Sequence, residues 1–192
     1  NANKFIDRVK QEAGLHLEII QPEEEARLAV ISCAPLVSTK TEKLLVVDIG
    51  GGSTELVWID LSSVPARERP RAIMRLHAGF HAVDSPFPAA KVVDWISVPL
   101  GVATLRDHFN DVDDDAGRYA LMSWFFEENL AEFAPYKDQP PREGFQIIGT
   151  SGTVTTVAAS HLGLKRYDRT KVDGLRMTSD QIDRVINSYL EM

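Results

Sequence analysis

The sequence has 192 residues but only one cysteine, Cys33, and no apolar run approaches the roughly 20 residues that a membrane-spanning helix needs. A single cysteine excludes a disulfide within the chain and fits a reducing cytoplasm. Cys33 is therefore predicted to be a buried small apolar residue and not a nucleophile. With no secretory signal in view, we expect a cytoplasmic protein that has no membrane partner.

Positive charge is also scarce, because 21 lysines and arginines face 28 aspartates and glutamates and give a net charge of −7. An acidic protein repels nucleic acid unless it concentrates positive charge locally, so no nucleic-acid partner is expected. A polyanionic ligand would have to be bound by backbone N–H groups, by a metal ion or by a local basic patch. The 44% hydrophobic content is typical of a globular protein with a sizeable core.

Apolar periodicity predicts a chain of alternating helices and strands, with a polar connector from Ser38 to Lys43 as the best domain boundary. The segment 61–91 is rich in Pro, Arg and Ala, and it predicts an insertion or long loop with some strand content near Ala72 to Leu76. The predicted helices cover 3–13, 22–34, 101–109, 117–136, 154–161 and the end of the chain from 180 onward. The predicted strands cover 15–20, 44–47, 53–60, 95–100 and 145–148.

Three consecutive glycines, Gly50, Gly51 and Gly52, stand between two of the predicted strands. A two-residue turn at Gly51 and Gly52 would close a hairpin. Glycine permits positive φ and a close approach of ligand to backbone, and successive N–H groups at such a turn form a concave anion site. Ser53 and Thr54 add hydroxyl donors. The segment predicts a phosphate-binding loop, with an ordinary glycine-rich hairpin as the alternative.

The register of that hairpin places Asp48 directly opposite Glu55. Like charges in directly opposed positions destabilise a sheet. A divalent cation would remove the conflict, and Mg²⁺ is the usual companion of phosphates. We therefore predict a Mg²⁺ site at Asp48 and Glu55, bound directly or through water. The alternative is that both carboxylates lie at the surface.

A second glycine-containing segment, made of Gly149, Thr150, Ser151, Gly152 and Thr153, follows a short apolar strand and precedes a helix. Such a strand-to-helix turn directs the N–H groups of a helix start toward an anion. It is not a Walker loop, because no lysine follows the last glycine. It is not the elbow of a serine hydrolase, because Gly152 follows Ser151 directly. Phosphate binding and a structural capping turn are both consistent with it.

Three glutamates, Glu23, Glu24 and Glu25, occupy the first turn of the helix that Pro22 is predicted to begin. Acidic residues at this position ordinarily complement the helix dipole. A phosphohydrolase, however, needs a carboxylate that orients and deprotonates water. The turn therefore also contains a candidate general base.

In this order the segments resemble the exopolyphosphatase and guanosine pentaphosphate phosphohydrolase (Ppx/GppA) family. The resemblance covers most of the chain and is weakest over 61–91. Any single motif is shared with the wider actin-like ATPase group, whereas the combination is specific. The matching motifs are Pro22-Glu23-Glu24-Glu25-Ala26-Arg27-Leu28, the segment from Val46 to Val57, Val98-Pro99-Leu100-Gly101, and the segment from Ile148 to Thr153.

The resemblance implies an α/β fold of the actin and sugar-kinase type, with a ribonuclease H-like mixed sheet flanked by helices in each of two lobes. Residues 1–21 would be the C-terminal tail of the first lobe, 22–37 an interdomain helix and 43–192 the second lobe. The phosphate loop of the first lobe is absent from the sequence. We therefore expect a central fragment that is inactive alone. The full-length parent is expected to be able to form a homodimer.

The resemblance also implies roles for individual residues. Glu25 corresponds to the general base, and Asp48 and Glu55 to the metal-linked carboxylates. The segments 50–54 and 149–153 correspond to two opposing phosphate contacts. The implied reaction is the Mg²⁺-dependent hydrolytic release of the terminal phosphate from inorganic polyphosphate or from guanosine pentaphosphate, and the implied partners are polyphosphate or guanosine penta- or tetraphosphate. The alternatives are a non-catalytic sensor of nucleotides or polyphosphate, and an actin-like ATPase or kinase.

Overall fold

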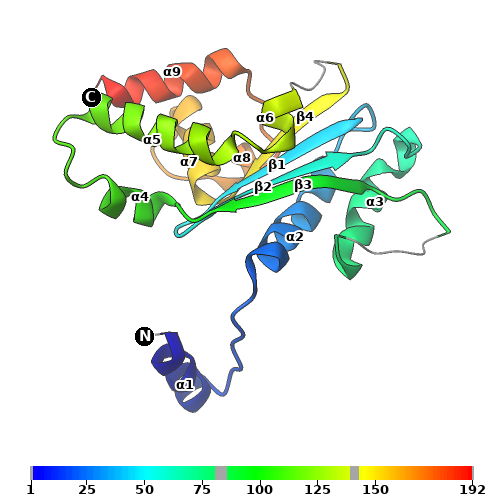
Figure 1. The fold of residues 1–192 in the computed structure, drawn as a ribbon, viewed down its shortest axis with the longest axis horizontal. Helices are drawn as coiled ribbons and strands as arrows, with labels where there is room; N and C mark the ends of the chain where they lie inside the picture. Colours follow the sequence, from blue (N-terminus) through cyan, green and yellow to red (C-terminus); the bar gives the residue numbers. More distant parts are fainter. Residues whose placement is uncertain (1, 81–85, 139–142, 192) are drawn as a thin grey trace.

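The computed structural model describes residues 2–80, 86–138 and 143–191. Its four strands form one sheet in the order β3-β2-β1-β4, in which β1 is antiparallel to β2 and parallel to β4. Figure 1 shows α2 and α3 on one face of this sheet and α4, α5, α7 and α9 on the other. The strands are β1 (Lys43–Ile49), β2 (Thr54–Asp60), β3 (Lys91–Val98) and β4 (Phe145–Thr150).

The described part of the chain contains nine α-helices and three short 3₁₀ helices, of which α1 lies apart from the sheet in Figure 1. The α-helices are α1 (Ala2–Ala13), α2 (Pro22–Ser32), α3 (Arg69–Met74), α4 (Val102–His108), α5 (Asp115–Leu130), α6 (Ala134–Asp138), α7 (Ser151–His161), α8 (Arg169–Val172) and α9 (Ser179–Leu190). The 3₁₀ helices are η1 (Ala34–Leu36), η2 (Ala66–Glu68) and η3 (Arg75–Ala78).

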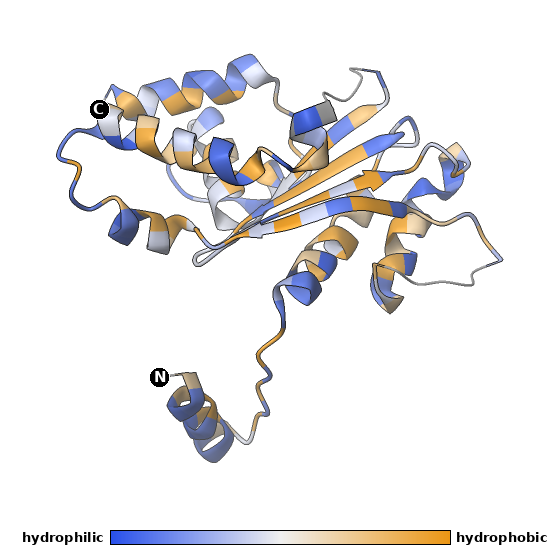
Figure 2. Cartoon of the chain, viewed as in Figure 1, coloured by the Kyte–Doolittle hydropathy of each residue, from blue (hydrophilic) through white to orange (hydrophobic). Residues whose placement is uncertain are grey.

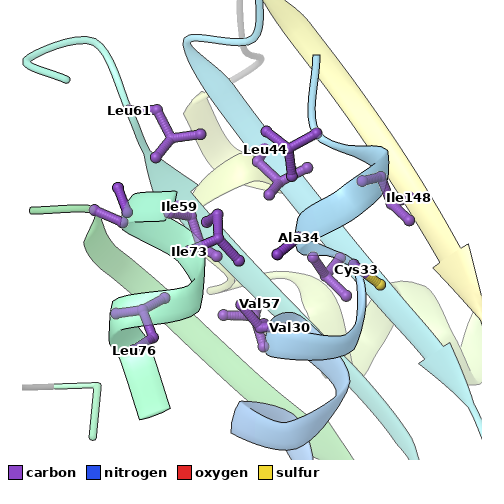
Figure 3. Close-up of a cluster of buried hydrophobic side chains, with 14 of the residues drawn as sticks. Val30, Cys33, Ala34, Leu44, Val57, Ile59, Leu61, Ile73, Leu76 and Ile148 are labelled. Atoms are coloured by element: carbon purple, nitrogen blue, oxygen red, sulfur yellow. The ribbon is translucent and has the colours of Figure 1, made fainter. Parts of the chain in front are cut away.

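Side chains of the central strands alternate between two hydrophobic layers, because successive residues of a strand point to opposite faces. Leu44 and Val46 of β1 face α2, whereas Leu45 and Val47 face α4 and α5. The apolar colour along the strands in Figure 2 follows from this burial on both faces. Figure 3 shows the α2 layer, where α2, η1 and α3 pack on the sheet.

Helix α2 packs on the sheet through small side chains. Pro22 occupies its first turn, and Ala26, Ala29 and Val30 are its buried residues. Alanine at the contact lets the helix axis approach the sheet closely, because packing distance depends on the side chains between two elements. Cys33 is buried at the end of this helix, as predicted, and burial raises the pKa of its thiol.

Two predicted strands are wrong. The segment 72–76 forms the end of α3 and the start of η3, because Ala72, Ile73 and Leu76 lie at helical spacing and are buried together. The segment 15–20 is extended but pairs with no strand of the described chain, and all six residues are exposed. Alternation alone does not make a strand, since a strand needs a neighbour for its backbone hydrogen bonds.

The other predicted elements are found, with one helix divided. The predicted helix 117–136 consists of α5 and α6, which are separated between residues 130 and 134. Part of the predicted insertion, 81–85, lies outside the described residues. The assignment of 1–21 to a first lobe stays a prediction, and α1 has no buried residue. Among the described residues, no helix is both long enough and apolar enough to cross a membrane.

An ion pair joins the two strands of the hairpin at the end away from the glycine turn. Lys43 Nζ lies 2.6 Å from Asp60 Oδ2, and the backbone N–H of Ser62 donates to Asp60 Oδ1 over 2.8 Å. Burial alone would raise the pKa of Asp60. The hydrogen bonds from Lys43 and Ser62 outweigh it and hold the pKa of this carboxyl at about 2.

We predict that Asp60→Asn lowers the free energy of unfolding by about 1–2 kcal/mol at neutral pH. The stabilisation is fully present above the unfolded-state pKa of about 3.9. It is lost as pH falls through the folded-state pKa of about 2. The difference between wild type and variant should therefore shrink as pH falls, which urea denaturation at a series of pH values measures.

Glu132→Gln is the matched control, because it removes an exposed ion pair with Lys137 in which the Glu132 side chain is 89% exposed. Exposed pairs contribute little, so this variant should stay within about 0.5 kcal/mol of wild type at every pH. Equal losses of unfolding free energy in the two variants would contradict a stabilising role for the ion pair between Lys43 and Asp60.

Candidate functional site

The hairpin between β1 and β2 has the register that the sequence predicted. Asp48 pairs with Glu55, and the N–H of Gly50 donates to the carbonyl of Ser53 over 3.0 Å. Gly51 and Gly52 are therefore the two turn residues. Neither has a positive φ, so the turn does not use the left-handed conformation that glycine favours. A Cβ built on either residue would meet no atom within 4 Å, so the backbone of the turn is open to a ligand.

The start of α4 lies beside the hairpin turn in Figure 1, and its residues donate hydrogen bonds to the carbonyl groups of all three glycines. A Cβ on Gly101, the residue before α4, would lie only 2.4 Å from the carbonyl oxygen of Gly50, so this close contact requires glycine. The sequence contained Gly101 in a family motif, but its packing role was not predicted. The hydrogen bonds run from the N–H of Val102 to Gly50 (3.0 Å), from the N–H of Ala103 to Gly51 (2.9 Å) and from the hydroxyl of Thr104 to Gly52 (3.3 Å).

These bonds determine where the N–H groups of the turn point. A trans peptide is planar, so its N–H points opposite to its carbonyl. Because the glycine carbonyls point toward α4, the N–H groups of Gly51, Gly52 and Ser53 point away from α4. None of these three N–H groups donates a hydrogen bond within the described chain. They form a row of available donors of the kind that binds an anion.

The two hydroxyls beside the turn differ in their availability. The hydroxyl of Thr54 is buried and already donates to the carbonyl of Leu100 over 2.8 Å, so it links β2 to the segment before α4. The hydroxyl of Ser53 has no hydrogen-bond partner among the described residues and is partly exposed. Ser53 is therefore the more available hydroxyl donor of the two.

Asp48 and Glu55 lie on the face of the sheet that α2 covers. Each is two residues away from a valine on that face, Val46 in β1 and Val57 in β2, and residues two apart in a strand point to the same side. Glu55 is only 1% exposed, and its Oε1 accepts a hydrogen bond from Ser97 Oγ over 2.8 Å. Its Oε2, together with Oδ1 of Asp48, is buried and has no hydrogen-bond partner in the described chain. The contact between Ser97 and Glu55 was not predicted from the sequence. It follows from the strand pairing, which places Ser97 of β3 opposite Glu55.

Two unpartnered carboxylate oxygens on adjacent strands fit a divalent cation. Buried charges are costly unless they are paired or coordinate a metal. Mg²⁺ typically takes one or two protein carboxylates and completes its coordination with water and phosphate oxygens. The described residues contain no group of three or more His, Cys, Asp or Glu side chains placed to hold a metal. The donor set thus fits a cation that is shared between Asp48, Glu55 and a phosphate.

Glu25 differs in environment from the other two glutamates of its turn. Burial raises the pKa of Glu25, and the nearby carboxylates of Glu55 and Asp48 raise it further. Glu24 instead accepts hydrogen bonds from Arg27, which lower its pKa. Glu23 is exposed. Glu25 is exposed as well, but its carboxyl lies in the field of the Glu55 and Asp48 carboxylates.

The second predicted loop is a direct junction between β4 and α7. Gly149 and Thr150 belong to the strand, and the helix begins at Ser151. Ser151 has φ 73°, and it is the one non-glycine residue of the described chain with a positive φ. Such a conformation is unusual outside glycine, asparagine and aspartate and is often found at functional sites. Gly149 is constrained too, because a Cβ there would lie 2.8 Å from a methyl group of Val154.

The two glycine-containing segments face one cavity of about 740 Å³. Gly50 and Gly51 line it from the first segment, and Ser151, Gly152 and Thr153 line it from the second. The hydroxyl of Thr153 also donates to the carbonyl of Ile49 over 3.3 Å and so connects the two segments. The three carboxylates do not line this cavity but lie on the α2 side of the same hairpin.

We predict that Mg²⁺ raises the melting temperature of the wild-type chain and not that of the variant with Asp48→Asn and Glu55→Gln. Without Mg²⁺, the double variant should be at least as stable as wild type, because it removes two uncompensated charges. Thermal unfolding with and without Mg²⁺ measures both effects.

Asp94→Asn is the control for this experiment. Asp94 accepts hydrogen bonds from the N–H groups of Trp95 and Ala134, away from the paired carboxylates. This variant should lose stability but keep the response to Mg²⁺. A Mg²⁺ response that persists in the double variant would rule out the site.

Comparison with known proteins gives a consistent result. The model of the Ppx/GppA phosphatase family matches residues 1–192. The crystal structure of the Aquifex aeolicus member of that family is similar over 100% of this chain and 51% of its own, with 30% identity and a TM-score of 0.64. The crystal structure of an exopolyphosphatase-like protein is 29% identical over 100% of this chain and 53% of its own, with a TM-score of 0.73.

A more distant similarity connects the chain to a larger protein. The bifunctional 3-dehydroquinate synthase/phosphatase of Fusobacterium nucleatum is 23% identical over 199 residues, which cover 100% of this chain and 25% of that protein. The chain thus spans about half the length of the similar solved structures and a quarter of the bifunctional protein.

Proposed function

The chain belongs to the Ppx/GppA phosphatase family, and from that membership we propose that it supplies half of the active site of a phosphoanhydride hydrolase. The reaction is the release of terminal phosphate from inorganic polyphosphate, from guanosine pentaphosphate or from both. The mixed sheet flanked by helices is the actin-like ATPase fold of the solved relatives. One observation carries the proposal: Glu25 lies in the field of two carboxylates, each with one buried and unpartnered oxygen, on the hairpin that presents the free N–H groups.

Glu25 has the properties of a general base. A base that takes a proton from water works best when its pKa approaches the working pH, and burial and two neighbouring carboxylates raise the pKa of Glu25. The burial of Glu25 is slight, and its position in the first turn of α2 leaves the side chain exposed and accessible to water. In the proposed reaction Glu25 orients a water molecule and accepts its proton as the oxygen attacks phosphorus.

The N–H groups of Gly51, Gly52 and Ser53 bind the phosphoryl oxygens. Phosphoryl transfer depends mainly on positioning and on stabilising the charge of the equatorial oxygens. Backbone donors that are already oriented do this without rearranging during the reaction. They also suit a protein with a net charge of −7, because they attract an anion without adding basic side chains.

The remaining roles belong to the carboxylates and the second segment. Asp48 Oδ1 and Glu55 Oε2 are the oxygens that would hold Mg²⁺, which when bound offsets the negative charge of the phosphates. Ser151, Gly152 and Thr153 contact the phosphate chain from the opposite wall of the shared cavity.

We predict that Glu25→Gln lowers the rate of phosphate release by about 10²- to 10⁴-fold, because the amide cannot accept the proton. The KM should change little, since the substrate is held by other groups. The measurement is phosphate release by the protein at its natural length, with polyphosphate, guanosine pentaphosphate or ATP supplied together with Mg²⁺.

Glu23→Gln is the control, because Glu23 lies on the same turn and is exposed. It should keep wild-type activity, and a Glu25→Gln variant that does the same would refute the assignment. If ADP forms only when an acceptor is added, the protein is a kinase. If every substrate binds and none releases phosphate, the protein is a sensor.

A further inference from the structure

Thr104, in the first turn of α4, connects two parts of the chain that are 52 residues apart. Its hydroxyl oxygen accepts a hydrogen bond from the N–H of Gly101 over 2.8 Å. The same hydroxyl can donate to the carbonyl of Gly52 over 3.3 Å or to the carbonyl of Gly101 over 3.2 Å. One side chain therefore joins the start of α4 to the glycine turn.

This contact differs from the other two that hold the turn. The carbonyls of Gly50 and Gly51 accept hydrogen bonds from backbone N–H groups, which a change of side chain does not remove. The carbonyl of Gly52 depends on the hydroxyl of Thr104, because no other group of the described chain donates to it. Gly52 has no side chain to restrict its backbone, and a Cβ built there would meet no atom within 4 Å.

The Gly52 carbonyl and the Ser53 N–H belong to the same planar peptide, so they rotate together. A hydrogen bond that fixes the carbonyl also fixes the direction of the N–H. Without the Thr104 hydroxyl this peptide would sample several orientations, and the Ser53 N–H would be aligned for only part of the time. An anion would then have to order the peptide as it binds, which lowers affinity.

We infer that Thr104 is a positioning residue that aligns the Ser53 N–H for a phosphoryl oxygen. The inference rests on the proposed phosphate-binding function of the glycine turn and assigns a further residue to it. The Thr104 hydroxyl lies on the carbonyl side of the peptide between Gly52 and Ser53 and the Ser53 N–H points away from α4, so Thr104 acts through the backbone and not by touching the ligand.

The test compares Thr104→Val with Thr104→Ser in the protein at its natural length. Valine keeps the shape of threonine and loses the hydroxyl, whereas serine keeps the hydroxyl and loses the methyl group. Tripolyphosphate affinity is measured by calorimetry. The orientation of the amide groups of Gly51, Gly52 and Ser53 is followed by ¹⁵N NMR without and with tripolyphosphate.

We predict a dissociation constant raised about tenfold by Thr104→Val, as expected for the loss of one hydrogen bond. Thr104→Ser should stay within about twofold of wild type. In Thr104→Val, the Ser53 amide resonance should move or broaden even without tripolyphosphate. In the phosphate-release assay, KM should rise and kcat should change much less, because the base is untouched.

Thr178→Val separates positioning from stability. Thr178 also joins the capping interactions of a helix start, as the N-cap residue of α9 whose hydroxyl accepts from the N–H of Gln181, and it lies far along the chain from the turn. This variant should lose stability like Thr104→Val and bind tripolyphosphate like wild type. If Thr104→Val binds as wild type does, or if Thr178→Val weakens binding equally, the inference is overturned. The proposed hydrolase activity fails on a different result, namely no phosphate release by the wild-type protein.

Discussion

The antiparallel pairing of β1 with β2 across Gly51 and Gly52 determines almost every relationship in the site. It places Asp48 opposite Glu55 and sends both carboxylates to the face that α2 covers. A slip of one residue would move each side chain to the other face of the sheet. The carboxylates would then enter the second hydrophobic layer, and Glu25 would lose the neighbours that perturb it. The geometry of the site therefore depends on the register of this one hairpin.

Much of this hairpin could be predicted from the sequence, because local chemistry specifies it. Consecutive glycines between apolar runs favour a short turn, and the turn length then fixes which residues pair. The roles of Gly101 and Thr104 could not be predicted, since they depend on α4 docking against a turn some fifty residues earlier. The hydrogen bond from Ser97 to Glu55 could not be predicted from the sequence for the same reason. Pairing partners within one hairpin are local information, whereas contacts between distant elements are not.

The wrong predictions share a cause with these omissions. Alternation over 15–20 predicted a strand, but the structure provides no neighbouring strand there. Around Ala72 and Leu76 the apolar spacing fits a strand and a helix over so few residues, and packing against α2 and η1 selects the helix. The left-handed backbone conformation of Ser151 is also determined by tertiary structure, because serine itself does not favour that conformation.

The small side chains of α2 have a consequence for how such a site can change. Ala26 is fully buried, in the hydrophobic cluster between the helix and the sheet that carries the paired carboxylates. The small volume of Ala26 therefore helps to set how far Glu25 stands from Asp48 and Glu55. One added methyl group at this contact would lift the whole first turn of the helix. The pKa of Glu25 is in this sense influenced by residues that carry no reactive group at all.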